Sequence, residues 1–339
     1  MELGALLDGA TVVIDGGTGT LGTALVRVLL DRCRLRKLVL LSRSEARQAA
    51  MKRQYPENGG PLRYLIGDVR DAARLLDAYE GADVVIHAAA LKRVEVCERE
   101  PKEALSTNVL GTLNACEAAR QRGVHRFMLI SSDKATAACT TYGATKYLAE
   151  RLTIGMNNYR GARDIRYSAV RYGNVLGSTG SVLDTFRTCD GRVPITDPAM
   201  TRFWLTPAQA AEFVLSSLAL MRGGEVFVPK LPSARLLDMA EAFAPGAAID
   251  VIGTRGVEKI AECLVSADEA PWTIDLGDRF AILPAAPTWP GATWPDRQRM
   301  PAGWAYTSDT NVQWLTPKQL RSMADGGHLG GWRRRLLVG

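Results

Sequence analysis

A glycine-rich turn between an apolar run and an amphipathic segment constrains the fold of this chain most. In "TVVIDGGTGTLGTALVRVLL", residues 11–30, glycines recur at positions 16, 19 and 22. Glycine lets a turn approach a diphosphate closely, and the N-terminus of the following helix offers unpaired N–H groups and the positive end of its dipole. The strand before these glycines and the helix after them make the motif far more specific than its spacing alone. The stretch predicts a βαβ unit that binds a dinucleotide.

The first 180 residues repeat this alternation of apolar runs and helical patterns, which is typical of a parallel sheet. The apolar runs are rich in β-branched residues, as expected for strands covered on both faces. We expect strands at 11–15, 37–42, 62–68, 83–89, 126–132 and 166–173, with helical segments that include 21–32 and 101–122. The prediction is an α/β fold: a Rossmann doubly wound parallel sheet with a smaller C-terminal substrate-binding region.

The alternation of apolar runs and helical patterns ends near Pro194, where proline becomes frequent. Six of the seven tryptophans lie after residue 270. This shift in composition predicts a cofactor-binding domain over 1–193. A mainly substrate-binding region, loop-rich and Trp-rich at its end, is predicted over 194–339. We expect some of its segments to return to the sheet domain.

Composition excludes several classes of function. The chain is 47% hydrophobic and 23% charged, with no apolar run of membrane length and no secretory leader, so we expect neither a membrane protein nor a secreted one. Six cysteines without CxxC spacing indicate reduced thiols in a cytoplasmic protein and no metal site. The net charge of +6 is dispersed, so a phosphorylated cofactor and a nucleotide substrate explain it better than nucleic acid.

The end of the second expected strand indicates the cofactor. "LLSRSEAR" places Ser42 and Arg43 there, with Arg47 one turn later, where an NAD enzyme generally has a carboxylate for the ribose hydroxyls. A guanidinium matches a 2′-phosphate, so the sequence predicts NADP. The other interpretation is a pair of solvated surface arginines. The remaining predicted cofactor-binding residues follow the glycine turn and the ends of later strands: Gly16, Thr18, Gly19, Thr20, Leu21, Gly22, Asp68, Val69, Ala88, Ala89, Ala90, Asn108 and Tyr172.

Two polar residues near this site are given other roles. Asp15 directly precedes the glycines, and we expect its carboxylate to point away from the phosphates and to cap a nearby backbone group. His87 lies within an apolar strand, which favours a structural histidine with satisfied hydrogen bonds over a catalytic base.

The stretch "SSDKATAACTTYGATK", residues 131–146, carries the candidate chemistry. Tyr142 and Lys146 have the YxxxK spacing found in enzymes that transfer a hydride to or from a nicotinamide, and Ser132 supplies an upstream hydroxyl. An acid and a base, Asp133 and Lys134, follow that serine at once. In isolation such a pair is most often a solvated surface ion pair. Its place after the strand, shortly before Tyr142, favours catalysis instead.

These motifs resemble the extended short-chain dehydrogenase/reductase superfamily. The Asp-Lys pair and the stretches "RYGNVLGSTGSV" (171–182), "PITDPAMTRFWLT" (194–206), "RGVEKIAE" (255–262) and "YTSDTNVQWLT" (306–316) resemble its inverting UDP-N-acetylglucosamine 4,6-dehydratases. The chain departs from that subgroup at Thr179, at Gly256 and Val257, and at Arg93.

The resemblance implies a conversion of UDP-N-acetylglucosamine to a UDP-2-acetamido-2,6-dideoxy-hexos-4-ulose. The steps are oxidation at C4, elimination of water across C5 and C6, and reduction at C6 with inversion at C5. Tyr142 is the acid–base partner of the C4 hydroxyl, and Lys146 lowers its pKa. Asp133 protonates the leaving C6 hydroxyl, which requires a raised pKa. Lys134 removes the C5 proton, which requires a lowered pKa.

The resemblance also implies a substrate pocket and an assembly. A UDP-linked amino sugar is the expected partner, and a homo-oligomer is the expected state. Expected substrate-binding residues are Lys92, Asn174, Val175, Thr196, Met200, Arg202, Arg255 and Glu258. Three alternatives within the fold stay open: a nucleotide-sugar 4-epimerase, a ketoreductase and a 5,6-dehydratase. A non-catalytic NADP-sensing regulator is the alternative from another class.

Overall fold

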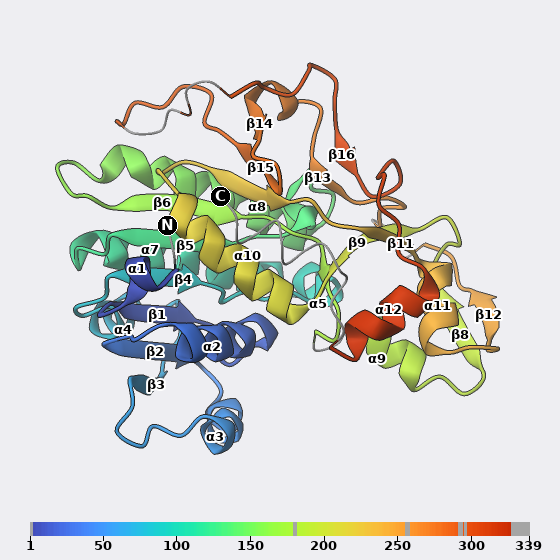
Figure 1. Ribbon diagram of the computed structural model, residues 1–339, viewed down its shortest axis with the longest axis horizontal. Helices are drawn as coiled ribbons and strands as arrows, with labels where there is room; N and C mark the ends of the chain where they lie inside the picture. Colours follow the sequence, from blue (N-terminus) through green and yellow to red (C-terminus); the bar gives the residue numbers. More distant parts are fainter. Residues whose placement is uncertain (1–2, 179–181, 255–257, 291–293, 295–296, 327–339) are drawn as a thin grey trace.

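The computed structural model describes residues 3–178, 182–254, 258–290, 294 and 297–326. A nine-stranded sheet with the order β14-β15-β10-β6-β5-β4-β1-β2-β3 runs through its centre (Figure 1). The strands of this sheet are β1 (Thr11–Asp15), β2 (Lys37–Ser42), β3 (Leu62–Ile66), β4 (Val84–His87), β5 (Arg126–Ile130), β6 (Arg166–Val170), β10 (Val226–Pro229), β14 (Thr273–Asp275) and β15 (Arg279–Ile282).

The order β3-β2-β1-β4-β5-β6 is that of a doubly wound sheet, and all five of its pairings are parallel. The predicted α/β Rossmann fold is therefore confirmed. Beyond β6 the chain adds β10 in parallel, and β15 and β14 then continue the sheet antiparallel. These three strands come from the C-terminal half of the chain and lie beside the strands of the first half.

Helices cover the sheet. α2 (Thr20–Arg32) packs against α10 (Pro207–Leu220), whereas α4 (Ala72–Ala78), α7 (Gly111–Gln121) and α8 (Thr141–Gly155) pack side by side (Figure 1). Shorter or more peripheral helical elements are α1 (Leu3–Leu7), α3 (Glu45–Gln54), α5 (Val94–Arg99), α6 (Pro101–Leu105), η3 (Met156–Tyr159) and η4 (Ala270–Trp272). Within the described residues, no helix has the length and apolar character needed to cross a bilayer.

The strands end earlier than predicted. The expected ranges 62–68, 83–89, 126–132 and 166–173 stop at Ile66, His87, Ile130 and Val170. Small residues (Gly67, Ala88 and Ser131) follow three of these ends, so the local pattern does not mark where the chain leaves the sheet; β6 is followed at once by the charged Arg171. The predicted helical segment 101–122 is also interrupted, by a π-helical turn, η1 (Ser106–Leu110), between α6 and α7. Both differences bring side chains to the carboxyl edge of the sheet.

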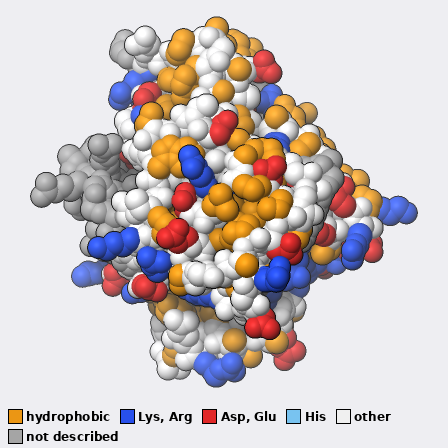
Figure 2. Space-filling view, turned by 90° about the vertical axis from the view of Figure 1, so that its right-hand side faces the viewer, with side chains coloured by type: hydrophobic (Ala, Val, Ile, Leu, Met, Phe, Trp, Pro, Cys, Tyr) orange, Lys and Arg blue, Asp and Glu red, His pale blue; other side chains and the backbone are white. Residues whose placement is uncertain are grey.

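A smaller unit carries a second hydrophobic core. It contains the sheet of β7 (Asn174–Val175), β9 (Thr201–Leu205) and β11 (Ser233–Arg235), the pair β8 (Arg192–Ile195) and β12 (Ala248–Val251), and the helices α9 (Val182–Arg187), α11 (Leu236–Phe243) and α12 (Pro317–Ala324). Its core joins Leu176 and Phe186 to Trp204 and Met239, residues from both sides of position 193. On the face that this unit presents, charged side chains of both signs surround a patch of hydrophobic ones (Figure 2).

A buried arginine ties the C-terminal half to the sheet. Arg171 follows β6 and binds Glu150 of α8 through two hydrogen bonds of 3.0 and 2.6 Å. Its guanidinium also binds Glu269 at 2.8 and 2.9 Å, and Thr136 Oγ1 at 2.8 Å. Arg171 and Glu150 are each 1% exposed, so these charges are held by one another rather than by water.

A second buried network replaces the cap predicted for Asp15. Its carboxylate accepts hydrogen bonds from the Tyr79 hydroxyl and lies 2.8 Å from His87 Nδ1. His87 Nε2 is in turn 3.2 Å from Thr112 Oγ1. The prediction that Asp15 caps a backbone group is wrong, because two side chains from neighbouring elements bind its Oδ2, and its Oδ1 has no hydrogen-bond partner among the described residues. His87 is fully buried with both ring nitrogens paired, which fits the predicted structural role.

Candidate active site

The glycine-rich turn lies where β1 passes into α2. Gly16 has φ +71°, and a Cβ on it would lie 2.9 Å from the Ala89 nitrogen, so a side chain is excluded on both counts. A Cβ on Gly22 would overlap the Gly17 backbone, which lets α2 start close to the turn. Gly19 is the N-cap of α2 and makes no side-chain cap, so the first N–H groups of the helix are left for a ligand. The residues present fit a dinucleotide diphosphate.

The residues predicted to select the cofactor lie at the carboxyl end of β2. Ser42 is buried, and its hydroxyl accepts a hydrogen bond of 3.1 Å from Gln48. Arg43 is half exposed (52%), and its guanidinium is 3.6 Å from Asp68. Arg70 donates to the same carboxylate, and these contacts outweigh burial and lower the pKa of Asp68. Arg47 is also exposed at the start of α3. Two cations therefore stand beside the end of β2.

Asn108 fixes the loop that follows β4. Its side-chain oxygen accepts a 2.7 Å bond from the Leu91 nitrogen, and its amide donates to the Leu91 carbonyl at 2.9 Å and to Thr145 at 3.0 Å. These contacts join the π-helical turn, the 88–91 loop and α8. Asn108 thus braces the site, and its amide nitrogen has two protein acceptors. Ala88 and Ala89 lie against Gly16, as their small size allows.

Tyr142 and Lys146 occupy the first two turns of α8, next to the end of β5. The hydroxyl of Thr140 caps this helix at 3.0 Å from Gly143 N, which sets where the helix begins. Lys146 Nζ donates to the Ile130 carbonyl at 2.6 Å, and burial lowers the pKa of Lys146 to about 8. Burial raises the pKa of Tyr142 to about 12.

The prediction that Lys146 lowers the pKa of Tyr142 is not met, because Lys146 is not among the main groups that shift it. The cation that acts most against the rise is Lys134, followed by a hydrogen bond with Ser132. The amine of Lys146 donates a hydrogen bond to the Ile130 carbonyl instead, and burial lowers the pKa of this amine, which favours its uncharged form. The positive charge beside the phenol thus comes from the residue predicted as the base.

The acid–base pair forms a compact turn after β5. Asp133, Lys134 and Ala135 make a single 3-10 turn, η2 (Asp133–Ala135), which the Ser132 hydroxyl caps. Ser132 Oγ donates to Asp133 Oδ1 at 2.8 Å, and Lys134 Nζ lies 3.2 Å from the same oxygen. Asp133 is 1% exposed and Lys134 28%. Burial and the charge of Glu262 raise the pKa of Asp133, as its predicted acid role requires.

Lys134 does not have the lowered pKa that was predicted for a base. Its ammonium lies 3.2 Å from Glu262 Oε1 as well as 3.2 Å from Asp133 Oδ1. Burial works against the charged form, but the two carboxylates outweigh burial and raise the pKa of Lys134. The prediction failed because the sequence did not reveal the second carboxylate.

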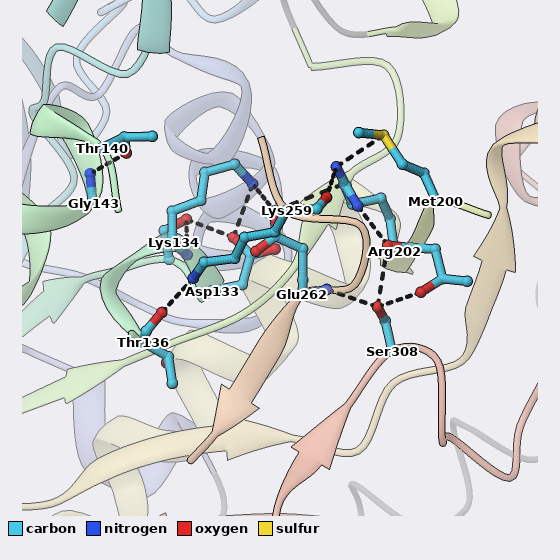
Figure 3. A network of polar contacts seen from close by, with 12 residues as sticks. Asp133, Lys134, Thr136, Thr140, Gly143, Met200, Arg202, Lys259, Glu262 and Ser308 are labelled. Carbon is cyan, nitrogen blue, oxygen red and sulfur yellow. Dashed lines mark hydrogen bonds and ion pairs between the residues drawn. The ribbon is translucent and has the colours of Figure 1, made fainter. Parts of the chain in front are cut away.

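Glu262 is the residue that sequence reasoning missed. Figure 3 shows it facing Lys134 from the segment before β13 (Cys263–Val265), which pairs with β16 (Tyr306–Thr307). Ser308 Oγ accepts the Glu262 N–H at 2.9 Å, and Arg202 Nε is 3.7 Å from its carboxylate. The stretch "RGVEKIAE" ends in this glutamate, but nothing local to the stretch distinguishes it from a solvated charge.

Two of the expected substrate residues, Met200 and Arg202, have side chains that are engaged within the protein. Met200 is 1% exposed and belongs to the smaller core, so its side chain faces no open surface. Arg202 donates from Nη1 to the carbonyls of Thr201 (2.7 Å) and Ile260 (3.0 Å), and from Nη2 to that of Lys259 (2.9 Å). It pins the 259–262 segment to β9, and Lys259 Nζ reaches the Thr136 carbonyl at 2.5 Å on the other side (Figure 3).

Other expected residues lie toward the space between the two units. Asn174 and Val175 form β7, which pairs with β9, and both are half-buried; Thr196 is half-buried after β8. Lys92 lies near Arg93 and Arg47, and desolvation together with their charge lowers its pKa. Glu258 is exposed. Arg255 lies outside the described residues, as do Thr179, Gly256 and Val257.

The parts described so far define a class of protein. A doubly wound sheet with a glycine-rich turn after β1, and with Ser132, Tyr142 and Lys146 at its carboxyl edge, is the arrangement of an extended short-chain dehydrogenase/reductase. Within that class, the chain belongs to the polysaccharide biosynthesis protein family, whose model matches residues 12–284.

Three known proteins are similar over most of their length. The chain is 38% identical over 326 residues to a UDP-N-acetylglucosamine 4,6-dehydratase (inverting) of Campylobacter jejuni, covering 93% of this chain and 97% of that protein. It is 36% identical to a UDP-glucose 4-epimerase of Rickettsia prowazekii, over 80% and 82% of the two chains. The solved structure of Pen from Bacillus thuringiensis superposes with a TM-score of 0.85 at 32% identity, over 98% and 99%.

Proposed function

We propose that this protein is a nucleotide-sugar 4,6-dehydratase that converts UDP-N-acetylglucosamine to the 4-keto-6-deoxy sugar with inversion at C5. The observation that carries the proposal is the Asp133–Lys134 contact of 3.2 Å, on the turn between Ser132 and Tyr142. Elimination of water across C5 and C6 needs an acid and a base in addition to the residues of hydride transfer. The 38% identity to a dehydratase of this type supports the same function.

The protein's side chains have defined roles in this reaction. A nicotinamide cofactor held at the glycine-rich turn would supply the hydride acceptor for C4 and the hydride donor for C6. Tyr142, after it has released its own phenolic proton, removes the proton of the C4 hydroxyl, and the Ser132 hydroxyl orients that oxygen. The resulting ketone acidifies the C5 hydrogen, which Lys134 removes in its amine form, while Asp133 gives a proton to the departing C6 hydroxyl. Because two carboxylates hold Lys134 as an ammonium, it must release a proton before it acts as a base.

The proposal has a direct test. Purified protein incubated with UDP-N-acetylglucosamine and no added cofactor should yield a sugar lighter by one water, with NMR showing inversion at C5. A sugar of unchanged mass with inverted C4 would show a 4-epimerase instead, which the 36% identity to an epimerase makes the second candidate. An epimerase leaves C5 untouched and has no use for Asp133 or Lys134. Binding of NADP without any sugar chemistry would point to a regulator.

We propose NADP as the cofactor. Arg43 and Arg47 are exposed beside the end of β2, and Arg43 is paired with Asp68 only at 3.6 Å. An exposed ion pair of that length is weak, so the guanidinium can turn to a 2′-phosphate at small cost. Thr18, Thr20, Leu21 and Val69 would line the dinucleotide, and Tyr172 would lie beside its nicotinamide end.

A UDP-linked amino sugar would bind between the sheet and the smaller unit. We place Lys92, Asn174, Val175, Thr196, Arg255 and Glu258 at its rim. Arg202 contributes by holding the 259–262 segment rather than through its own donors, three of which reach main-chain carbonyls. A complex with UDP bound far from this rim would contradict the assignment.

We also propose a homo-oligomer in the cytoplasm, a compartment that keeps thiols reduced. Leu113, Leu148 and Tyr159 are 38%, 44% and 70% exposed on α7, α8 and η3. A second copy covering these apolar side chains would bury them. Leu148→Glu should lower the mass measured by light scattering, whereas Val312→Glu, at another exposed apolar residue, should not. A monomeric wild-type protein would refute this.

A further inference from the structure

We propose that Glu262 is a positioning residue for the elimination: it takes the ammonium of Lys134 as its counter-ion and thereby leaves Asp133 protonated for the C6 hydroxyl. This inference rests on the dehydratase function proposed above. Glu262 would touch neither substrate nor cofactor. It would act through the protonation state of the two residues that do.

Lys134 lies between two buried carboxyl groups, those of Asp133 and Glu262. Lys134 Nζ is 3.2 Å from an oxygen of each of two carboxylates, and those carboxylates are 1% and 3% exposed. Of two buried carboxylates that share one ammonium, the one with fewer other cations beside it binds a proton more readily. Asp133 Oδ2 and Glu262 Oε2 are both buried without a hydrogen-bond partner among the described residues.

The surrounding charges decide which carboxylate keeps the proton. Arg202 of β9 is 3.7 Å from Glu262, and Lys259 lies on the same segment with its amine on the Thr136 carbonyl. These cations and Lys134 together lower the pKa of Glu262 against the effect of burial. Asp133 faces Lys134 and the hydroxyl of Ser132, and its pKa is raised. Asp133 is therefore the carboxyl group of the pair that binds a proton more readily.

The remaining titratable neighbours do not change this assignment. Tyr142 of α8 faces Lys134, and burial keeps it a neutral phenol at neutral pH. Cys263 of β13 follows Glu262, and burial raises the pKa of its thiol, so it too is neutral. The cationic neighbours of the pair are Lys134, Arg202 and Lys259, and of the two carboxyl groups only Asp133 has a raised pKa.

The proton balance of the elimination follows from this state. Lys134, 28% exposed, first releases one proton to water. Its amine then takes the C5 proton, and the electrons of that C–H bond form the C5–C6 double bond. The C6–O bond breaks with its electrons on oxygen, and the proton of Asp133 completes the water that leaves. The pair ends as an ammonium and a carboxylate, and Glu262 keeps its charge throughout.

The test is the pH dependence of single-turnover dehydration and of deuterium uptake at C5 from heavy water. Glu262→Gln removes a negative charge beside both members of the pair, so the pKa of each falls and both limbs of the profile move to lower pH, by about 1–3 units. Glu262→Asp keeps the negative charge but places it farther from Lys134 and Asp133. Both limbs of the pH profile of this variant should therefore move in the same direction as in the Gln variant, but by less. If the Gln variant does not fold, the Asp variant alone decides: unmoved limbs overturn the proposal.

Two controls separate positioning from support of the fold. Glu225→Gln alters another buried glutamate, 1% exposed and bound to Ser168 at 2.7 Å, and should lower the melting temperature without moving the limbs. In an Asp133→Asn background the limb assigned to Asp133 should be absent, and Glu262→Gln should move only the remaining limb. If wild-type protein does not dehydrate the sugar, the proposed function itself fails. If it does and neither Glu262 variant shifts the limbs, only this inference fails.

Discussion

The amine of Lys146 donates a hydrogen bond of 2.6 Å to the main-chain carbonyl of Ile130, at the last residue of β5. Burial lowers the pKa of this amine to about 8, although Glu150 one turn further along α8 acts against the shift. In the unfolded chain the pKa is about 10.4. Between these values the unfolded chain binds more protons than the folded one, so the free energy of unfolding rises with pH.

Lys146→Met should remove that pH dependence. Relative to the variant, wild-type protein should gain about 3 kcal/mol of unfolding free energy between about pH 8 and pH 10.4, and little outside that window. Urea unfolding of both proteins across that range measures the difference. Lys52→Met, an exposed lysine on α3, should show no such trend. A constant difference at every pH would mean that Lys146 is a charged amine in the folded protein.

Arg43→Ala should weaken binding of NADP⁺ more than that of NAD⁺. The loss of one charge-assisted contact to a phosphate is worth about 1.5–3 kcal/mol, or roughly ten- to hundredfold in affinity. Calorimetric titration of both cofactors measures it, with Lys52→Ala as a control cation on the neighbouring helix. Equal affinity of the wild-type protein for the two cofactors would refute the assignment to NADP.

Lys134→Ala should separate oxidation from elimination. Deuterium uptake at C5 should fall by about 10²–10⁴-fold, and reduced nicotinamide should accumulate with a 4-keto sugar. Oxidation should also slow, because the charge of Lys134 lowers the pKa of Tyr142. Tyr142→Phe, in contrast, should give no reduced nicotinamide at all. Stopped-flow absorbance and NMR follow the two steps. Normal exchange at C5 in the Lys134 variant would make this lysine a spectator.

Arg171→Met should strongly destabilise the protein. The substitution leaves Glu150 and Glu269 without the guanidinium that joins them, and removal of one member of a buried ion pair costs about 3–5 kcal/mol. Arg36→Met, which breaks an exposed pair with Asp83, should cost at most about 1 kcal/mol. Thermal unfolding of the two variants tests the contrast. Similar melting temperatures would show that the buried network contributes little.

The sequence predicted the parts of the fold and site that depend on local pattern. Gly16 and Gly22 sit where backbone approaches backbone, and all five predicted catalytic side chains, within residues 131–146, lie around one strand end and the turns that follow it. Strand ends were less predictable, because Ala88 and Ala89 continue an apolar run after the chain has left the sheet.

The protonation states were not predictable, because they depend on residues distant in sequence. Glu262 and Lys134 are in contact although more than a hundred positions separate them in the sequence. With Asp133 as the only known partner of Lys134, the direction in which the pKa of Lys134 shifts stays open. Arg202 illustrates the same limit: "MTRFW" marks a specialised segment, but only the structure shows its guanidinium bound to main-chain carbonyls. Charge pairs of this kind leave no periodic signal in a sequence.

The path of the chain through the sheet has a consequence for how the site is assembled. The turn with Asp133 and Lys134 is made early in synthesis, but Glu262 follows only after β10 has been added beside β6. Synthesis from the N-terminus therefore completes the glycine-rich turn, Tyr142 and Lys146 before Glu262 is added to the chain. In the order of the sequence, the residues proposed to bind a dinucleotide precede the second carboxylate partner of Lys134.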